Sequence, residues 1–370
     1  MSSVIESVPF LDLTTEFSEL EDGWIEAIRE TGQSGAFIMG PNVRAFEKEV
    51  ANYIGVKHAI GVANGTDALV LSLRALGIGP GDEVITTPYT FFATSESINL
   101  VGATPVFADI LEDNFTLDPA SVRHCLGDKT RAIMPVHLFG CPANMDEINA
   151  IAKENGIAVV EDAAQAFGAT VGKAKVGSLG DTGCFSFYPT KVMGCYGDGG
   201  LVTTNNDDVA EHINHLRNHG AIKPFVHTEV GYNSRLDEIQ AALLRLKLKR
   251  IDAAIEGRRA VAAAYTKRLE GKVIAAPAAP AYGGHAYNLY TTRLENRNDL
   301  RQRLIDNQIG SSLCYPLPLH LQEVYRSLDY AEGSLPRAEK ASLEALSLPI
   351  YPGMPPSHID HVCDVLLEKG

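Results

Sequence analysis

The chain has 370 residues, which is long for one hydrophobic core and predicts two domains of unequal size. Its net charge of −14 argues against nucleic acid as the main partner, because nucleic-acid binding needs a basic surface. No apolar run reaches the roughly 18 residues of a membrane span, and the N-terminus lacks a signal-peptide pattern, so we expect a cytoplasmic protein. The six cysteines and eleven histidines have no metal-ligand spacing, so we expect reduced thiols and no metal.

The first two-thirds of the chain alternates short β-branched runs with helical patterns. Helices are expected at 67–77 and 146–156. Strands are expected at 58–64, 82–88, 104–110, 130–140 and 157–164. This order predicts an α/β fold with a mostly parallel sheet and helices on both faces. Such sheets bind ligands at the carboxyl ends of their strands.

The sequence changes in character after about residue 240. We expect a long amphipathic helical stretch over 241–271, followed by a connector rich in Ala, Pro and Gly over 273–285. One strand is then expected over 286–295, with further helices over 299–308 and at the C-terminus. These features predict a large domain over 1–250 and a smaller α/β domain over 251–370. An alternative for the N-terminal segment 1–30 is that it packs outside the large domain.

One candidate anion site lies at 63–68, between a predicted strand and a predicted helix. Free backbone N–H groups at a helix start attract anions, Gly65 permits close approach, and Thr66 adds a hydroxyl. The spacing is not a dinucleotide fingerprint, because G-x-G-x-x-G is missing. The alternative is that Asn64 or Thr66 only caps the helix.

Two further segments offer an acid and an amine. Asp162 ends a buried apolar strand, where a carboxylate needs a partner such as a protonated pyridine nitrogen, unless it only caps a helix. Lys191 follows the aromatic segment 184–190 and precedes a Gly-rich turn at 197–200. Burial there lowers the pKa of a lysine and makes its amine nucleophilic, as Schiff-base chemistry requires. A fourth polar segment, 231–235, precedes a helix and is equally typical of a cap.

These segments resemble the DegT family of sugar aminotransferases, which are fold-type I pyridoxal-phosphate enzymes. The resemblance covers nearly the whole chain, through the segments 37–47, 64–69, 81–94, 135–140, 161–169, 185–191, 196–200, 217–220, 231–244, 315–320 and 346–352. It implies that Lys191 forms the Schiff base with pyridoxal 5'-phosphate and later moves a proton. It also implies that Asp162 pairs with the ring nitrogen and strengthens the ring as an electron sink.

The same resemblance implies roles for other residues. Gln165 is expected near the ring hydroxyl and Phe91 against the ring face. Gly65, Thr66 and Ser186 form the expected phosphate cradle. Asn233 is expected to reach the phosphate from a second subunit, which implies a homodimer with shared active sites.

Three positions depart from the family pattern. Val192-Met193 stands where Asn-Leu is usual, and Cys314 stands where a histidine commonly precedes Tyr-Pro. Both departures are expected near the substrate. Asn144 stands where Asp is frequent.

The family implies transfer of an amino group from a donor, expected to be L-glutamate, to a nucleotide-linked keto sugar. The segment 64–69, NGTDAL, favours amination at carbon 3 over carbon 4, because other branches read S-G-T-x-A-L or N-A-T-S-A-L. Candidate sugar or diphosphate contacts are Arg217, His219, Tyr315 and His320, each of which is also a plausible structural residue. The alternatives are a cyclitol or aromatic-precursor aminotransferase, a sugar dehydratase, which Lys191 argues against, and a non-catalytic cofactor-binding regulator.

Overall fold

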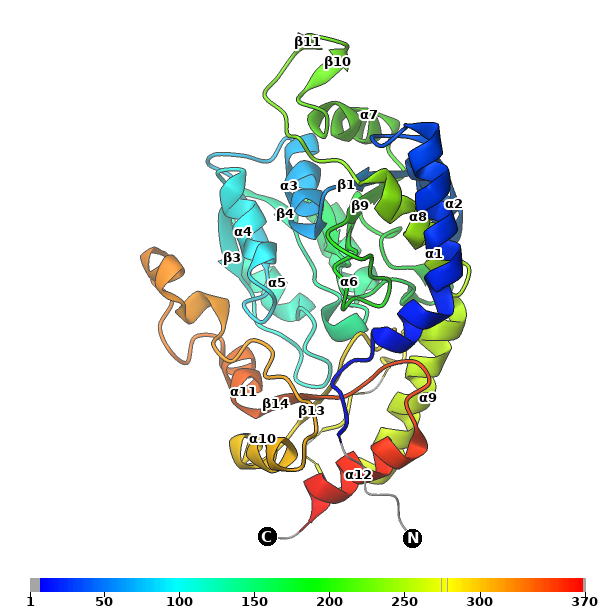
Figure 1. Cartoon of the computed structure of the whole chain (residues 1–370). Helices are drawn as coiled ribbons and strands as arrows, with labels where there is room; N and C mark the ends of the chain where they lie inside the picture. Colours follow the sequence, from blue (N-terminus) through cyan, green and yellow to red (C-terminus); the bar gives the residue numbers. More distant parts are fainter. Residues whose placement is uncertain (1–6, 274, 278, 369–370) are drawn as a thin grey trace.

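The computed structural model describes residues 7–368 except 274 and 278 (Figure 1). Its centre is a seven-stranded sheet with the order β1-β9-β8-β5-β4-β2-β3. The strands are β1 (His58–Val62), β2 (Glu83–Thr86), β3 (Thr104–Phe107), β4 (Thr130–Ile133), β5 (Ala158–Asp162), β8 (Thr182–Ser186) and β9 (Gly200–Thr204). β9 runs antiparallel to both of its neighbours, β1 and β8, and the other pairs in this sheet are parallel, so the prediction of a mostly parallel α/β sheet is confirmed.

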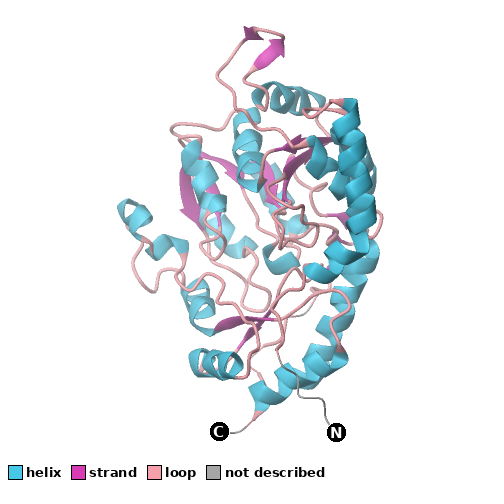
Figure 2. Cartoon of the chain, viewed as in Figure 1, coloured by secondary structure: helices cyan, strands magenta, loops and turns pink. Residues whose placement is uncertain are grey.

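Helices surround this sheet and cover both of its faces (Figure 2). The α-helices are α1 (Thr14–Ser34), α2 (Pro41–Ile54), α3 (Gly65–Ala75), α4 (Ala93–Leu100), α5 (Pro119–Cys125), α6 (Met145–Asn155), α7 (Asp207–Leu216), α8 (Glu238–Leu248), α9 (Ile251–Leu269), α10 (Arg297–Asp306), α11 (Pro336–Glu344) and α12 (Pro356–Leu367). Three 3-10 turns are η1 (Leu138–Gly140), η2 (Leu319–Leu321) and η3 (Glu323–Leu328). None of these helices, within the described residues, is long and apolar enough to cross a membrane.

Short strands lie outside the central sheet. β6 (Thr170–Val171) pairs with β7 (Ala174–Lys175) and β12 (Gly283–Gly284), and β10 (Ala221–Lys223) pairs with β11 (Val226–His227). The β10–β11 hairpin projects from the top of the molecule in Figure 1. β13 (Tyr290–Arg293) pairs with β14 (Ala345–Leu348) near the end that carries both termini.

Two expected elements end differently in the structure. The strand expected over 130–140 stops at Ile133, because Pro135 has no N–H to continue the ladder, and the chain then enters η1. The single helical stretch expected over 241–271 is two helices with a break at Lys249 and Arg250. The break redirects the chain, since α8 packs on α1 and α2 whereas α9 packs on α12.

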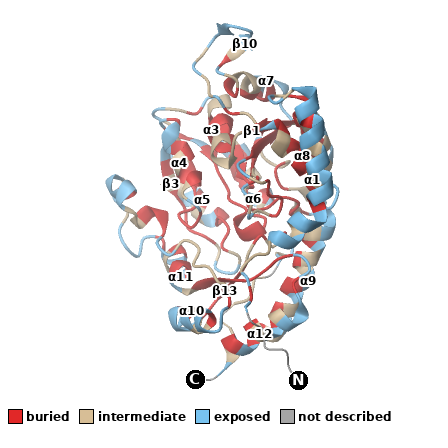
Figure 3. Ribbon diagram, viewed as in Figure 1, coloured by how far each residue is buried: buried red, intermediate tan, exposed pale blue. Residues whose placement is uncertain are grey.

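The C-terminal part has its own apolar cluster, built from α9, α10, α12, β13 and β14. Val8 belongs to this cluster, and Phe10 accepts a backbone hydrogen bond from Ile350 at 3.3 Å. The N-terminal segment therefore contacts the C-terminal part before α1 turns back to pack on α8. The domain boundary at residue 250 remains a prediction. Figure 3 shows the buried core between the sheet and its helices, and the exposed outer face of α1.

Candidate active site

The turn after β1 is shaped to receive an anion. Asn64 caps α3, since its side chain accepts a hydrogen bond from the Asp67 amide at 2.8 Å. Within the described chain, the amides of Gly65 and Thr66 at the start of α3 have no acceptor. A Cβ on Gly65 would lie 2.7 Å from the Ser186 Cβ, so only glycine lets this turn approach the end of β8 so closely. The capping role and the anion site therefore coexist in one segment.

Two adjacent carboxylates at the end of β5 have different environments, because successive side chains of a strand point to opposite faces. Glu161 is fully buried and accepts hydrogen bonds from the amides of Gly177, Leu179 and Gly180 and from His137 Nε2. These hydrogen bonds occupy both carboxylate oxygens of Glu161, so this side chain has a structural role. Asp162 faces the other side, toward Lys191.

Asp162 is buried without an ion pair to any described residue. Its Oδ2 accepts a hydrogen bond from the Thr94 hydroxyl at 2.7 Å, and Oδ1 accepts one from the Ala164 amide at 3.2 Å. Burial raises the pKa of Asp162 above its usual value, while the Thr94 hydrogen bond and the nearby Lys191 charge oppose that shift. A cationic ring nitrogen would supply the missing charge partner.

Lys191 lies just past β8, in the turn that follows Pro189 and Thr190. Burial lowers the pKa of its amine, and the carboxylate of Asp162 opposes the shift. The amine makes no hydrogen bond or ion pair with any residue that the structure describes. The charges of the acid and the amine therefore influence each other's pKa, although the two groups form no ion pair or hydrogen bond.

The remaining expected cofactor residues surround these two. The Phe91 ring is 61% exposed at the carboxyl end of β2, an unusual exposure for phenylalanine that suits a ring-stacking platform. Gln165 Oε1 accepts a hydrogen bond from the Phe139 amide at 2.8 Å, and its Nε2 donates to the Tyr315 hydroxyl at 2.8 Å. The structure therefore places Tyr315, expected as a sugar contact, against Gln165.

Two other expected substrate contacts have protein partners instead. Arg217 is buried and donates from Nη1 to Glu47 at 2.6 Å and to the Gly61 carbonyl at 2.7 Å. His320 is buried and its Nε2 lies 3.1 Å from Glu339. Both geometries fit structural roles, and the expected contacts of these two residues with substrate stay predictions.

The remaining substrate candidate, His219, and the expected phosphate residue, Asn233, lie on the segment between α7 and α8. His219 is exposed at the base of the β10–β11 hairpin, and its amide donates to the Tyr232 carbonyl at 2.8 Å. Asn233 is also exposed, and the next residue, Ser234, accepts a hydrogen bond from the Ala63 amide at 3.1 Å. This segment therefore borders the turn that carries Gly65.

Val192 and Met193, which were expected near the substrate, are packed in the protein interior, although Val192 also lines a pocket together with Lys191. Their place relative to the substrate stays a prediction. Both side chains are buried in the apolar cluster beneath α1 and α8, with exposed fractions of 8% and 1%. Cys314 is half-buried, and its Sγ accepts a hydrogen bond from the Ser347 hydroxyl at 3.6 Å. Asn144, the third departure, accepts a bond from the Glu147 amide as the cap of α6.

Taken together, the site offers free amides at a helix start, an unpaired buried carboxylate, an exposed aromatic ring and an amine whose pKa is lowered. These four groups match, in the same order, the phosphate, the ring nitrogen, the ring face and the aldehyde of pyridoxal phosphate. Residues 19–367 match the model of the DegT/DnrJ/EryC1/StrS aminotransferase family. The chain belongs to this family. It is a pyridoxal-phosphate-dependent aminotransferase.

Individual relatives cover almost the full length of the chain. It is 46% identical to a pleiotropic regulatory protein of Geobacillus stearothermophilus, over 98% of each chain. It is 43% identical to dTDP-3-amino-3,4,6-trideoxy-alpha-D-glucose transaminase of Streptomyces venezuelae, over 100% of this chain and 98% of the relative. A crystal structure of S. venezuelae DesV in complex with a ketimine intermediate has a TM-score of 0.95 and 42% identity, over 97% of each chain.

Sequence reasoning missed two residues that support the acid. Thr94 donates to Asp162, and its own hydroxyl oxygen lies 2.9 Å from the Thr90 hydroxyl. Because Thr94 uses its proton on Asp162, Thr90 must donate to Thr94. Both threonines lie within the segment 81–94 that carries the family resemblance, but no pattern in that segment shows which hydroxyl meets the carboxylate.

Proposed function

We propose that the chain transfers an amino group from L-glutamate to the keto group of a nucleotide-linked sugar. The observation that carries this proposal is the electrostatic pairing of Asp162 and Lys191 without direct contact, at the ends of the adjacent strands β5 and β8. Pyridoxal phosphate, when bound, supplies an aldehyde for the amine and a ring that withdraws electrons. Lys191 then serves as covalent anchor and as the group that moves a proton.

Each surrounding residue holds one part of this arrangement in the proposal. The amides of Gly65 and Thr66, with Ser186, bind the phosphate at the start of α3. Asp162, oriented by Thr94, keeps the ring nitrogen protonated. Phe91 covers the ring face and excludes water from it. Gln165 lies beside the ring hydroxyl.

We further propose that the reacting ketone is at carbon 3 of the sugar. The segment 64–69 favours that position, and the Streptomyces venezuelae relative is named for a 3-amino sugar. The test is an assay with glutamate against matched 3-keto and 4-keto nucleotide sugars, with mass spectrometry of the products. Selective amination of 3-keto substrates supports the proposal. Selective amination of 4-keto sugars or cyclitol ketones contradicts it, and a protein that binds the cofactor but aminates nothing points to regulation.

A homodimer with shared sites is the assembly that we propose. Large apolar side chains are exposed on and beside α1, at Leu13, Phe17, Ile25, Ile28, Phe37 and Ile38, and on the loops after β2 and β8, at Phe91 and Tyr188. An apolar surface of this kind, beside a cofactor site that lies open, is typical of a protein–protein interface. A second copy of the chain would cover it and bring its own Asn233 to the phosphate.

Mixing two inactive variants tests the shared site. Lys191→Ala and Asn233→Ala each damage every site of their own homodimers. If Asn233 acts across the interface, a mixed dimer has one intact site and one doubly altered site, so activity reappears when the variants are mixed and allowed to exchange subunits. If Asn233 acts within its own chain, every site of the mixed dimer stays damaged and no activity returns.

A further inference from the structure

A loop of the C-terminal part reaches the cofactor residues through one side chain. The Tyr315 hydroxyl accepts a hydrogen bond of 2.8 Å from Gln165 Nε2, and Gln165 lies three residues beyond Asp162. The Tyr315 ring packs edge-on against Tyr89 with ring centres 5.7 Å apart, and stacks near Phe139 at 6.1 Å. These two rings limit where the hydroxyl can go.

The contacts of Gln165 determine how its amide is turned. The Phe139 amide donates to Oε1 at 2.8 Å, and a backbone N–H can only donate. The amide oxygen must therefore face Phe139, and the nitrogen must face Tyr315. The nitrogen carries two protons, of which Tyr315 takes one. The second N–H has no acceptor among the described residues.

The backbone at Tyr315 is held in a costly conformation. Its φ is +58°, in the left-handed region that bulky residues avoid, and it precedes Pro316, which normally requires an extended residue before it. Such strain persists where surrounding contacts enforce it. Here the aromatic packing and a 3.3 Å hydrogen bond from the Tyr89 hydroxyl to the Cys314 carbonyl hold the loop. The loop is thus kept in a conformation that brings the Tyr315 hydroxyl to Gln165.

We propose that Tyr315 is a positioning residue that fixes the Gln165 amide, so that the second N–H points at the ring hydroxyl of pyridoxal phosphate. The inference rests on the proposed function, in which Gln165 lies beside that hydroxyl. A hydrogen bond donated by Gln165 to the ring oxygen would stabilise negative charge there and would lower the pH at which the bound cofactor loses a proton. Tyr315 therefore sets the pH at which the visible absorption of the bound cofactor changes.

The experiment is a pH titration of that visible absorption in three proteins. Tyr315→Phe removes only the hydroxyl and keeps the packed ring. Tyr325→Phe is the matched control, because it removes a hydroxyl from the same apolar cluster, and that hydroxyl bonds Asn99 rather than Gln165 or the loop that carries Tyr315. One hydrogen bond is worth about 0.5–1.5 kcal/mol, so the Tyr315→Phe midpoint should rise by about half to one pH unit. The Tyr325→Phe midpoint should stay at the wild-type value.

A double variant separates positioning from a general disturbance. In a Gln165→Ala background, Tyr315→Phe should produce no further shift, because the amide that it orients is gone. If Tyr315→Phe leaves the midpoint unchanged, or shifts it equally in the wild-type and Gln165→Ala backgrounds, this inference is wrong. Either result leaves the proposed function intact. Absence of any visible band from the wild-type protein mixed with pyridoxal phosphate overturns the proposed function and this inference with it.

Discussion

The hydroxyl of Thr94 donates a hydrogen bond of 2.7 Å to Oδ2 of Asp162, the carboxylate that faces Lys191. This bond joins the start of α4 to the end of β5, and it lowers the pKa of a carboxyl that burial raises. The ionised form of the acid is therefore favoured by the Thr94 hydroxyl, the Ala164 amide and the charge of Lys191, which oppose the effect of burial on its pKa. A cationic ring nitrogen bound there would keep its proton.

Replacing Thr94 tests this arrangement. Thr94→Val keeps the shape but removes the donor, so the Asp162 pKa rises further and the ring nitrogen is held less firmly. Hydrogen bonds to charged groups are worth about 1.5–3 kcal/mol, so kcat should fall about ten- to a hundredfold. The control is Ser97→Ala, whose hydroxyl bonds only the Thr94 carbonyl at 2.9 Å. Equal kcat values for Thr94→Val and wild type would contradict this account of the acid.

The phosphate cradle depends on the absence of a side chain at Gly65. Gly65→Ala would place a Cβ 2.7 Å from the Ser186 Cβ, which forces the turn and the end of β8 apart. We expect the dissociation constant for pyridoxal phosphate to rise at least about tenfold, a loss of about 1.4 kcal/mol. In Gly79→Ala, the new Cβ would come no closer than 3.6 Å to other atoms, and cofactor affinity should be unchanged. Fluorescence or absorbance titration of the apoenzyme measures both values.

The lowered pKa of Lys191 predicts a pH-dependent stability of the apoenzyme. The folded protein binds the Lys191 proton less tightly than the unfolded chain, so this group makes the free energy of unfolding rise as pH increases from the folded pKa to the usual lysine value. Lys191→Met lacks this dependence. Its melting temperature should therefore exceed that of wild type by a few degrees at neutral pH, with the gap closing toward pH 10.5. A gap that is constant with pH would show that the amine is not held in an unfavourable environment.

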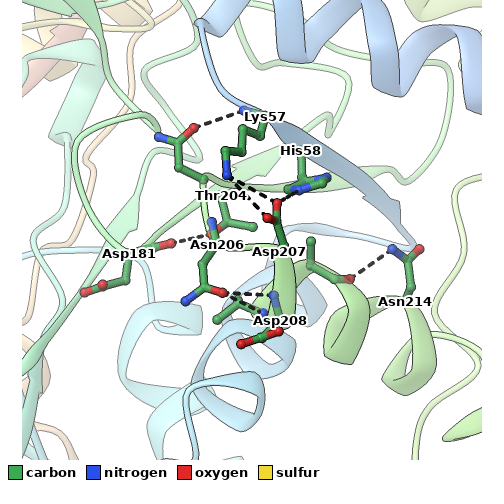
Figure 4. Close-up of polar contacts among 11 residues, drawn as sticks. Lys57, His58, Asp181, Thr204, Asn206, Asp207, Asp208 and Asn214 are labelled. Atoms are coloured by element: carbon green, nitrogen blue, oxygen red, sulfur yellow. Dashed lines mark hydrogen bonds and ion pairs between the residues drawn. The ribbon is translucent and has the colours of Figure 1, made fainter.

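A cap far from the site gives a test of the fold. The side chain of Asn206 accepts hydrogen bonds from the amides of Asp208 and Val209 at the start of α7 (Figure 4). Asn206→Ala should lower the free energy of unfolding by about 1 kcal/mol. Lys57→Ala, which removes only the exposed ion pair with Asp207, should cost less than about 0.5 kcal/mol. Urea unfolding of both variants, with activity at low denaturant unchanged, is the measurement.

The elements of the fold that could be predicted from the sequence are those with strong local patterns. Strand β5 and helix α6 lie close to their expected ranges because a buried apolar run and a helix closed by Gly156 are local signals. The break between α8 and α9 escaped prediction because the sequence around Lys249 contains neither Gly nor Pro. Its cause is tertiary, since the two helices pack on different parts of the molecule.

The candidate site likewise contains residues that local sequence patterns predict and contacts that they do not predict. Lys191 and Asp162 were predictable because each follows a recognisable strand inside a family segment. The contacts of Arg217, His320 and Tyr315 were not, because their partners Glu47, Glu339 and Gln165 are distant in the sequence. Whether a polar side chain faces a ligand or a protein partner depends on such long-range contacts.

The most direct test of the central claim is to treat the protein with borohydride in the presence of pyridoxal phosphate and to map the modified peptide by mass spectrometry. The account predicts a loss of visible absorption and a cofactor-derived mass on Lys191. In Lys191→Ala, that label and the transamination activity should both disappear. A label on another lysine, or a Lys191→Ala variant that transaminates as fast as wild type, would contradict the account.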